Sequence, residues 1–187
     1  MTAKKALAPS HPLEGTGRVV GLTAAAPGGI VLARKQQVLD FLFGATAFPA
    51  ADATLYCGLV TGTYTGGTSD IAILQGTFTS NPEVTTANWT NYAVVSITNN
   101  GTNWSTATGV AGTQVATKTN ATAISFTANA TVTGTGPTPT GWFLANSATL
   151  RAAANILATG NISSGSSAVV NGAAVSFAVG ALTLLLT

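Results

Sequence analysis

The side chains that could carry out chemistry are few in this sequence and stand far apart. The chain has one His and one Cys among 187 residues, and only 6% of its residues are charged. Catalysis needs groups that transfer protons, attack carbonyl carbons or hold metal ions. The one His, His11, lies between Ser10 and Pro12, far along the chain from any group of carboxylates. We therefore expect no catalytic residues, no metal site and no cofactor, and a protein that is not an enzyme.

The remaining candidates for ligand binding have simpler explanations. Asp52, Asp70 and Glu83 lack the spacing of a calcium-binding loop. The Gly-Thr-Gly sequences that begin at Gly15 and Gly134 neither follow a predicted strand nor open a helix, as a phosphate-binding loop requires. Both are predicted to be loop sequences.

The three Trp residues leave two interpretations open. Trp89, Trp104 and Trp142 lie in segments rich in Thr, Asn and Gly, and exposed Trp rings can form a platform on which the apolar faces of sugars pack. If the rings are buried, they belong instead to the core or to a subunit interface, where aromatic residues are also enriched. We favour the second interpretation and keep the first as the basis of an alternative function.

Positive charge is concentrated at the start of the chain. Five of the seven Lys and Arg residues lie within the first 35 positions, and segment 1–29 is interrupted by Pro9, Pro12 and Pro27. Such a segment cannot bury enough surface to fold alone. We expect an extended basic arm that becomes ordered on a partner, although a flexible tail fits the composition equally well. The basic residues have no aromatic residues interleaved with them, so an acidic protein surface is favoured over nucleic acid as the partner.

The apolar character of the chain indicates contact with other proteins rather than with a membrane. Mean hydropathy is +0.40, yet no apolar run approaches the roughly 18–20 residues of a membrane-spanning helix. Segment 6–17 lacks the apolar core of a signal peptide, so we expect neither a membrane partner nor export. A surface so poor in charge tends to associate, and we expect other chains to cover part of it.

One helix and a long β region are predicted after the arm. The helix is predicted over 30–45, with Gly44 as its C-terminal cap, and should cover one end of a sheet or contact a neighbour. Region 46–187 holds short runs of β-branched, aromatic and aliphatic residues separated by turn sequences. We expect a mainly β fold, an antiparallel β-sandwich with a jelly roll as its leading topology. Its lone Cys57 is predicted to be buried. The predicted strands are Thr54–Val60, Tyr92–Thr98, Ala121–Thr127, Ala130–Thr133, Gly141–Ala145, Asn155–Thr159, Ala173–Phe177 and Leu182–Leu186.

Several short motifs follow one another in a fixed order. They are Val38–Phe43, Leu55–Val60, Trp89–Val95, Ile124–Phe126, Gly141–Ala145, Ile156–Ile162 and Val169–Leu186. In this order they resemble a family of tailed-phage virion proteins, the jelly-roll capsid decoration or cement proteins, which are often labelled phage tail-fibre proteins. Two features depart from the family pattern: the strand around Tyr92 lacks the Arg that is common there, and residues 1–35 have no counterpart in it.

The resemblance implies a structural protein that decorates and stabilises a bacteriophage capsid. It would be made in the host cytoplasm and lie on the outer surface of the capsid in the virion, with the major capsid protein and further copies of itself, as a homotrimer, for partners. An alternative is a tail-fibre or adhesin domain that binds host-surface glycans through exposed aromatic residues. Together with the position of the positive charge, the first reading predicts a capsid-binding arm that uses Lys4, Lys5, Arg18, Val19, Val20, Leu22, Arg34 and Lys35.

Overall fold

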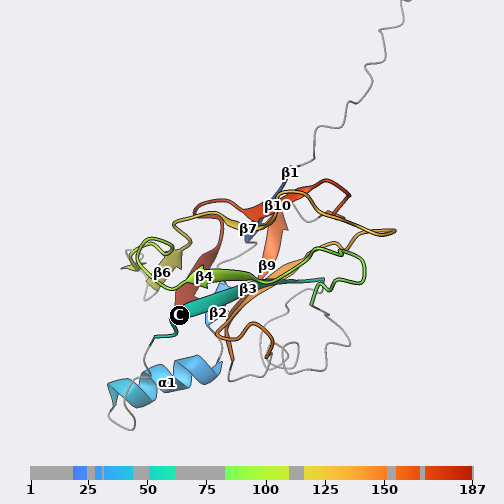
Figure 1. Cartoon of the computed structure of the whole chain (residues 1–187). Helices are drawn as coiled ribbons and strands as arrows, with labels where there is room; N and C mark the ends of the chain where they lie inside the picture. The colour runs from blue at the N-terminus through green and yellow to red at the C-terminus, as the bar shows by residue number, and fades with distance from the viewer. Residues whose placement is uncertain are drawn as a thin grey trace, which may run out of the picture.

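The described part of the chain is mainly β, with one short helix (Figure 1). The computed structural model describes residues 19–24, 28–30, 32–43, 51–61, 83–109, 116–150, 155–164 and 167–186. Within these residues the elements are β1 (Val19–Ala24), β2 (Gly28–Ile30), α1 (Leu32–Leu42), β3 (Thr54–Val60), β4 (Val95–Thr98), β5 (Thr108–Gly109), β6 (Ala116–Thr119), β7 (Ile124–Thr127), β8 (Gly141–Ala145), β9 (Ile156–Ser164), β10 (Ala174–Phe177) and β11 (Thr183–Leu186).

The strands form two groups that are joined by β1. The larger group has the order β4-β3-β8-β9-β2-β11-β6-β5, and the smaller group consists of β7, β10 and β1. Strand β1 pairs with β10 and, after a register shift between Thr23 and Ala24, also with β9 of the larger group. Most pairs of described strands are antiparallel, as predicted. The pairs β1–β10 and β2–β11 are parallel.

The two N-terminal strands correct the predicted extent of the arm. Segment 1–29 was expected to lie outside the body, but β1 runs beside β10 and β2 runs beside β11 and β9. The physical reason is that Gly28 and Gly29 give β2 little local strand preference, while pairing with distant strands satisfies the hydrogen bonds of its backbone. The body therefore includes Val19–Ala24, and residues 1–18 lie outside the described part of the chain.

The other predicted elements agree with the structure to different degrees. Strands β3 and β8 have the predicted bounds, and α1 lies inside the predicted helix but is shorter. Segment 130–133 is not a strand, because only Val132 makes an isolated bridge, to Trp89. The short strands β5 and β6 were not predicted. Within the described residues, no helix has the length and apolarity needed to cross a membrane.

The main hydrophobic cluster draws side chains from both groups of strands. It joins Cys57 and Leu59 of β3 and Trp142 of β8 to Phe126 of β7 and Phe177 of β10. Aromatic rings in contact extend through this core. Ring centroids are 5.1 Å apart for Trp89 and Tyr92, 6.2 Å for Tyr92 and Phe126, and 6.1 Å for Phe126 and Phe177. The rings of β7 and β10 thus pack against the segment before β4, and in this segment the hydroxyl of Tyr92 accepts from the backbone N–H of Leu59 in β3 at 2.9 Å.

Two glycines make room for the large rings of β8. Trp142 and Phe143 are neighbours on a strand, so their side chains lie on opposite faces of the sheet, and they belong to two separate clusters. A Cβ atom on Gly160 would lie 2.7 Å from Cζ2 of Trp142. A Cβ atom on Gly58 would overlap the ring of Phe143. Both rings thus pack directly against the backbone of a neighbouring strand.

A buried Asn joins three segments of the body. Asn120 is 1% exposed, and its side-chain nitrogen donates to the carbonyl oxygens of Thr122 at 2.8 Å and Ala178 at 2.7 Å. Its side-chain oxygen accepts from the backbone N–H of Leu182 at 2.8 Å. These three hydrogen bonds fix the turns that precede β7 and β11.

Replacing Asn120 by Ala is expected to lower the free energy of unfolding by roughly 2–4 kcal/mol, because buried backbone groups lose their partners without gaining water. Chemical denaturation followed by Trp fluorescence measures this change. Asn88→Ala is a suitable control, because Asn88 is exposed and the contact made at this position is through its backbone oxygen. Equal midpoints for the two variants would contradict the assigned role of Asn120.

Candidate functional site

Reactive groups do not come together in the described part of the chain. No set of three or more His, Cys, Asp and Glu side chains in the described residues could hold a metal ion. Cys57 is fully buried, as predicted, and this burial raises the pKa of its thiol because the thiolate would lose its hydration. Asp70 and His11 lie outside the described residues.

The predicted arm residues fall into three sets. Lys4, Lys5 and Arg18 lie outside the described residues. Val19, Val20 and Leu22 belong to β1, where their backbones are in register with β10. Arg34 and Lys35 belong to α1. The described members of the set therefore lie on two different elements, β1 and α1.

The prediction that Leu22 contacts a capsid is wrong. Its side chain is 1% exposed and belongs to the main hydrophobic cluster. Val19 and Val20 share its strand, and their backbones pair with Ala174 and Val175. These residues thus form part of the body, because strand pairing satisfies the backbone of β1 and burial removes the apolar side chain of Leu22 from water.

The two basic residues of α1 differ in their surroundings. Arg34 is half-buried, and its Nη1 atom donates to Oε1 of Gln37 at 2.8 Å. The Nη2 atom of Arg34 lies 3.2 Å from the side-chain amide of Asn146, which follows β8. Arg34 therefore fastens the helix to the body. Lys35 is also half-buried and remains a candidate for contact with a partner.

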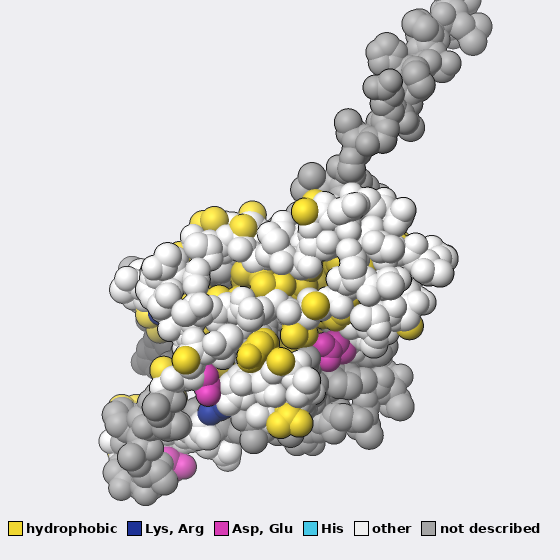
Figure 2. Space-filling model, viewed as in Figure 1, with side chains coloured by type: hydrophobic (Ala, Val, Ile, Leu, Met, Phe, Trp, Pro, Cys, Tyr) yellow, Lys and Arg dark blue, Asp and Glu magenta, His cyan; other side chains and the backbone are white. Residues whose placement is uncertain are grey.

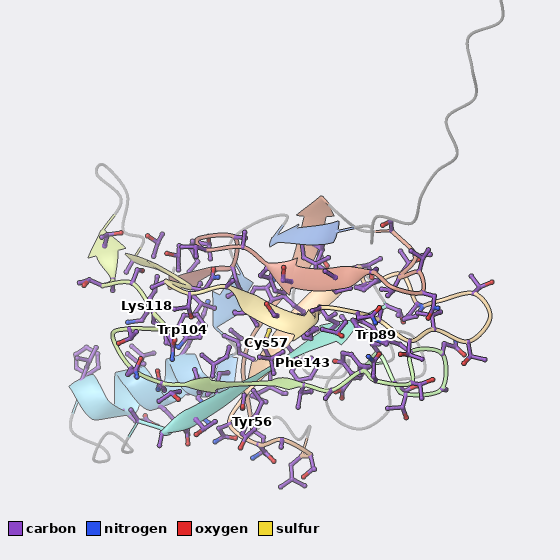
Figure 3. All side chains as sticks on the ribbon, turned by 45° about the horizontal axis from the view of Figure 1, so that its top comes forward. Tyr56, Cys57, Trp89, Trp104, Lys118 and Phe143 are labelled. Atoms are coloured by element: carbon purple, nitrogen blue, oxygen red, sulfur yellow. The ribbon has the colours of Figure 1, made fainter. Side chains whose placement is uncertain are left out.

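The three Trp residues do not form an exposed platform for sugars. Trp89, Trp104 and Trp142 are 0%, 2% and 1% exposed, and Figure 3 shows Trp89 and Trp104 within the body, on either side of Cys57. The Nε1 atom of Trp89 donates to Oδ1 of Asn91 at 2.9 Å, which holds the ring in place. The interpretation of these rings as core is confirmed, and the alternative function loses the residues on which it was based.

The surface visible in Figure 2 is poor in charge. Few Lys, Arg, Asp or Glu side chains appear on this face, and hydrophobic side chains form a band across its middle. Two shallow hollows of about 190 Å³ each lie in the described surface, one along β4 beside residues 122–124 and one between residues 132–136 and 168–171. Neither is lined by an ionisable side chain. This face of the described surface is thus apolar and poor in charge.

Exposed apolar side chains gather at the C-terminal end of α1 and at Phe43, the residue after it. Leu39, Leu42 and Phe43 are 55%, 63% and 83% exposed. Positions three and four apart share one face of a helix, so these residues form a stripe, which we call the α1 stripe. Val38, in contrast, is half-buried together with Arg34. Spacing alone does not reveal this stripe, because Val38 and Leu42 are four residues apart and would be placed on one face of the helix.

No protein-family model matches the chain, and no curated protein matches it.

Proposed function

We propose that this chain is a structural virion protein that decorates and cements a bacteriophage capsid. One observation carries the proposal: the described body places its Trp rings, its Cys and most of its large apolar side chains in the core, while Lys4, Lys5 and Arg18 precede the first strand. Such a division suits a stable module attached to a partner by a basic segment. The order of motifs shared with phage decoration proteins supports the same function.

The segment proposed to bind the capsid is shorter than the one expected from the sequence. It comprises residues 1–18, with Lys35 as a further basic contact. Strand β1 follows this segment and pairs with strands of both groups. Tension on the segment therefore reaches β9 and β10 directly. This is a suitable connection for an attachment segment, because the pull is spread over backbone hydrogen bonds in two sheets.

The proposal includes the finer architecture and the assembly. Two groups of strands that enclose one core support a sandwich, and we propose that it is a jelly roll. The charge-poor surface supports association with further copies, for which a homotrimer is the expected state. The chain would lie on the outer surface of the capsid, in contact with the major capsid protein and with neither nucleic acid nor membrane.

Deleting residues 1–17 is expected to leave a folded body that no longer binds capsids. The reason is that the deletion removes Lys4 and Lys5 but ends before Val19, where β1 begins. The measurement is co-sedimentation of the purified chain with capsids that lack it, quantified by gel densitometry. Raised salt should weaken attachment of the intact chain to the extent that Lys and Arg contribute.

Two controls make this deletion interpretable. An unchanged melting temperature shows that the truncated body is intact. A longer deletion, of residues 1–24, also removes β1 and is expected to destabilise the body, because Leu22 leaves the core. Binding of the 1–17 deletion at the occupancy of the intact chain would refute the proposed attachment. A copy number per particle comparable to that of the major capsid protein supports cement, and a few copies per particle support a tail component.

A further inference from the structure

Helix α1 is apolar on a face that the body leaves exposed. Arg34 and Val38 lie toward the body, whereas Leu39, Leu42 and Phe43 are all more than half exposed. Figure 1 shows the helix lying apart from the strands at one end of the body. The other large exposed apolar side chains of the described residues, Leu150, Val170 and Val179, do not share an element with it. The α1 stripe is thus a local concentration of apolar surface.

The length of the helix indicates that it needs a further contact. It has 11 residues, and isolated helices shorter than roughly 12–15 residues are marginal in water. Most helical stability in proteins comes from packing of an apolar face. Among the side chains of this segment that the structure describes, the largest apolar ones, those of Leu39, Leu42 and Phe43, are exposed. A partner that covers the α1 stripe would therefore both bury apolar surface and stabilise the helix.

We propose that the α1 stripe docks against the α1 stripe of a second copy of this chain. The charges of the helix support such a pair: Lys35 lies toward its beginning and Asp40 toward its end. In an antiparallel pair, the positive half of one helix lies beside the negative half of the other, and the helix dipoles oppose each other favourably. The contact is two-fold, so it is distinct from the three-fold contact that a homotrimer requires.

The size of the stripe sets the strength of this contact. If a large side chain offers roughly 150–250 Å², the three exposed fractions amount to roughly 300–500 Å² per copy. A stable interface buries about 800 Å² per partner, so the pair is weak between free chains. Tethering raises the effective concentration of neighbours to the millimolar range. The strengthening of the pair on a capsid rests on the proposed attachment to the capsid. The pairing of free chains does not.

Cross-linking of the purified chain tests the pairing without any capsid. Cys57 is the chain's one Cys and is fully buried, so an introduced Cys is the sole accessible thiol. Gln36 is exposed beside the stripe, and Gln36→Cys leaves all three apolar residues in place. We expect a short bis-maleimide to cross-link Gln36→Cys at least tenfold faster than Val179→Cys, a control at an exposed position outside α1.

A second variant separates pairing from mere exposure. Adding Leu42→Ser and Phe43→Ser to Gln36→Cys should reduce cross-linking to the rate of the Val179→Cys control, with an unchanged melting temperature of the body. Equal rates for Gln36→Cys and Val179→Cys at all protein concentrations would overturn the proposal. So would protection of the Gln36→Cys thiol from a monofunctional maleimide on capsids so sparsely occupied that bound copies have no neighbours, because the capsid would then be the occupant of the stripe.

Discussion

Replacing Phe177 by Ala is expected to lower the free energy of unfolding by about 3–5 kcal/mol. Phe177 is 0% exposed, and its ring centroid lies 6.1 Å from that of Phe126. Truncation leaves a cavity where the smaller group of strands meets the larger one, and the surrounding core can collapse into it only in part. Phe126→Ala should have an effect of similar size, because this ring also contacts Tyr92.

The chain supplies its own matched control for this experiment. Phe43→Ala removes the same atoms from a side chain that is 83% exposed, so its effect should lie within about 0.5 kcal/mol of zero. Denaturation should be measured at low protein concentration, so that contacts between copies do not contribute. Unchanged melting of both Phe177→Ala and Phe126→Ala would mean that the faces of β7 and β10 are wrongly assigned.

Buried strands that consist of an unbroken apolar run were predictable from the sequence. Thr54–Val60 and Gly141–Ala145 are runs of apolar residues between turn sequences, and both form strands with those bounds. Strand β2, Gly28–Ile30, has no such pattern. It is a strand because β9 and β11 flank it, and these partners lie more than a hundred residues away in the sequence. Pairing over such separations leaves no local signal.

Side-chain type alone could not place the aromatic and apolar residues. A Trp is compatible with a sugar platform and with a core, and the burial of the rings, with Trp142 packed over Gly160, shows that the core applies here. On α1 the sequence contains apolar residues on more than one face, so periodicity could not tell which face meets the body. The position of Arg34 beside Asn146 settles this, because it turns Val38 inward and Leu39 outward.

Particles assembled without this chain are expected to release their genome at lower temperature than complete particles. The proposed cement role supplies the reason: a ligand that binds the assembled shell but not its separated subunits stabilises the shell by its binding free energy. At a free concentration one hundred times its Kd, this amounts to about 2.7 kcal/mol per site. Many sites multiply the effect over the lattice. Release of DNA, followed by dye fluorescence during heating, measures the shift.

Adding purified chain back to these particles isolates the cause. The intact chain should restore the release temperature, and the chain without residues 1–17 should not, because its body, although folded, lacks the proposed attachment segment. A tail-fibre or adhesin role leads to a different phenotype, in which particles resist heat normally but adsorb poorly to host cells. That phenotype would reject the cement function. Since the Trp rings of the body are buried, it would also require that another part of the surface recognises the host.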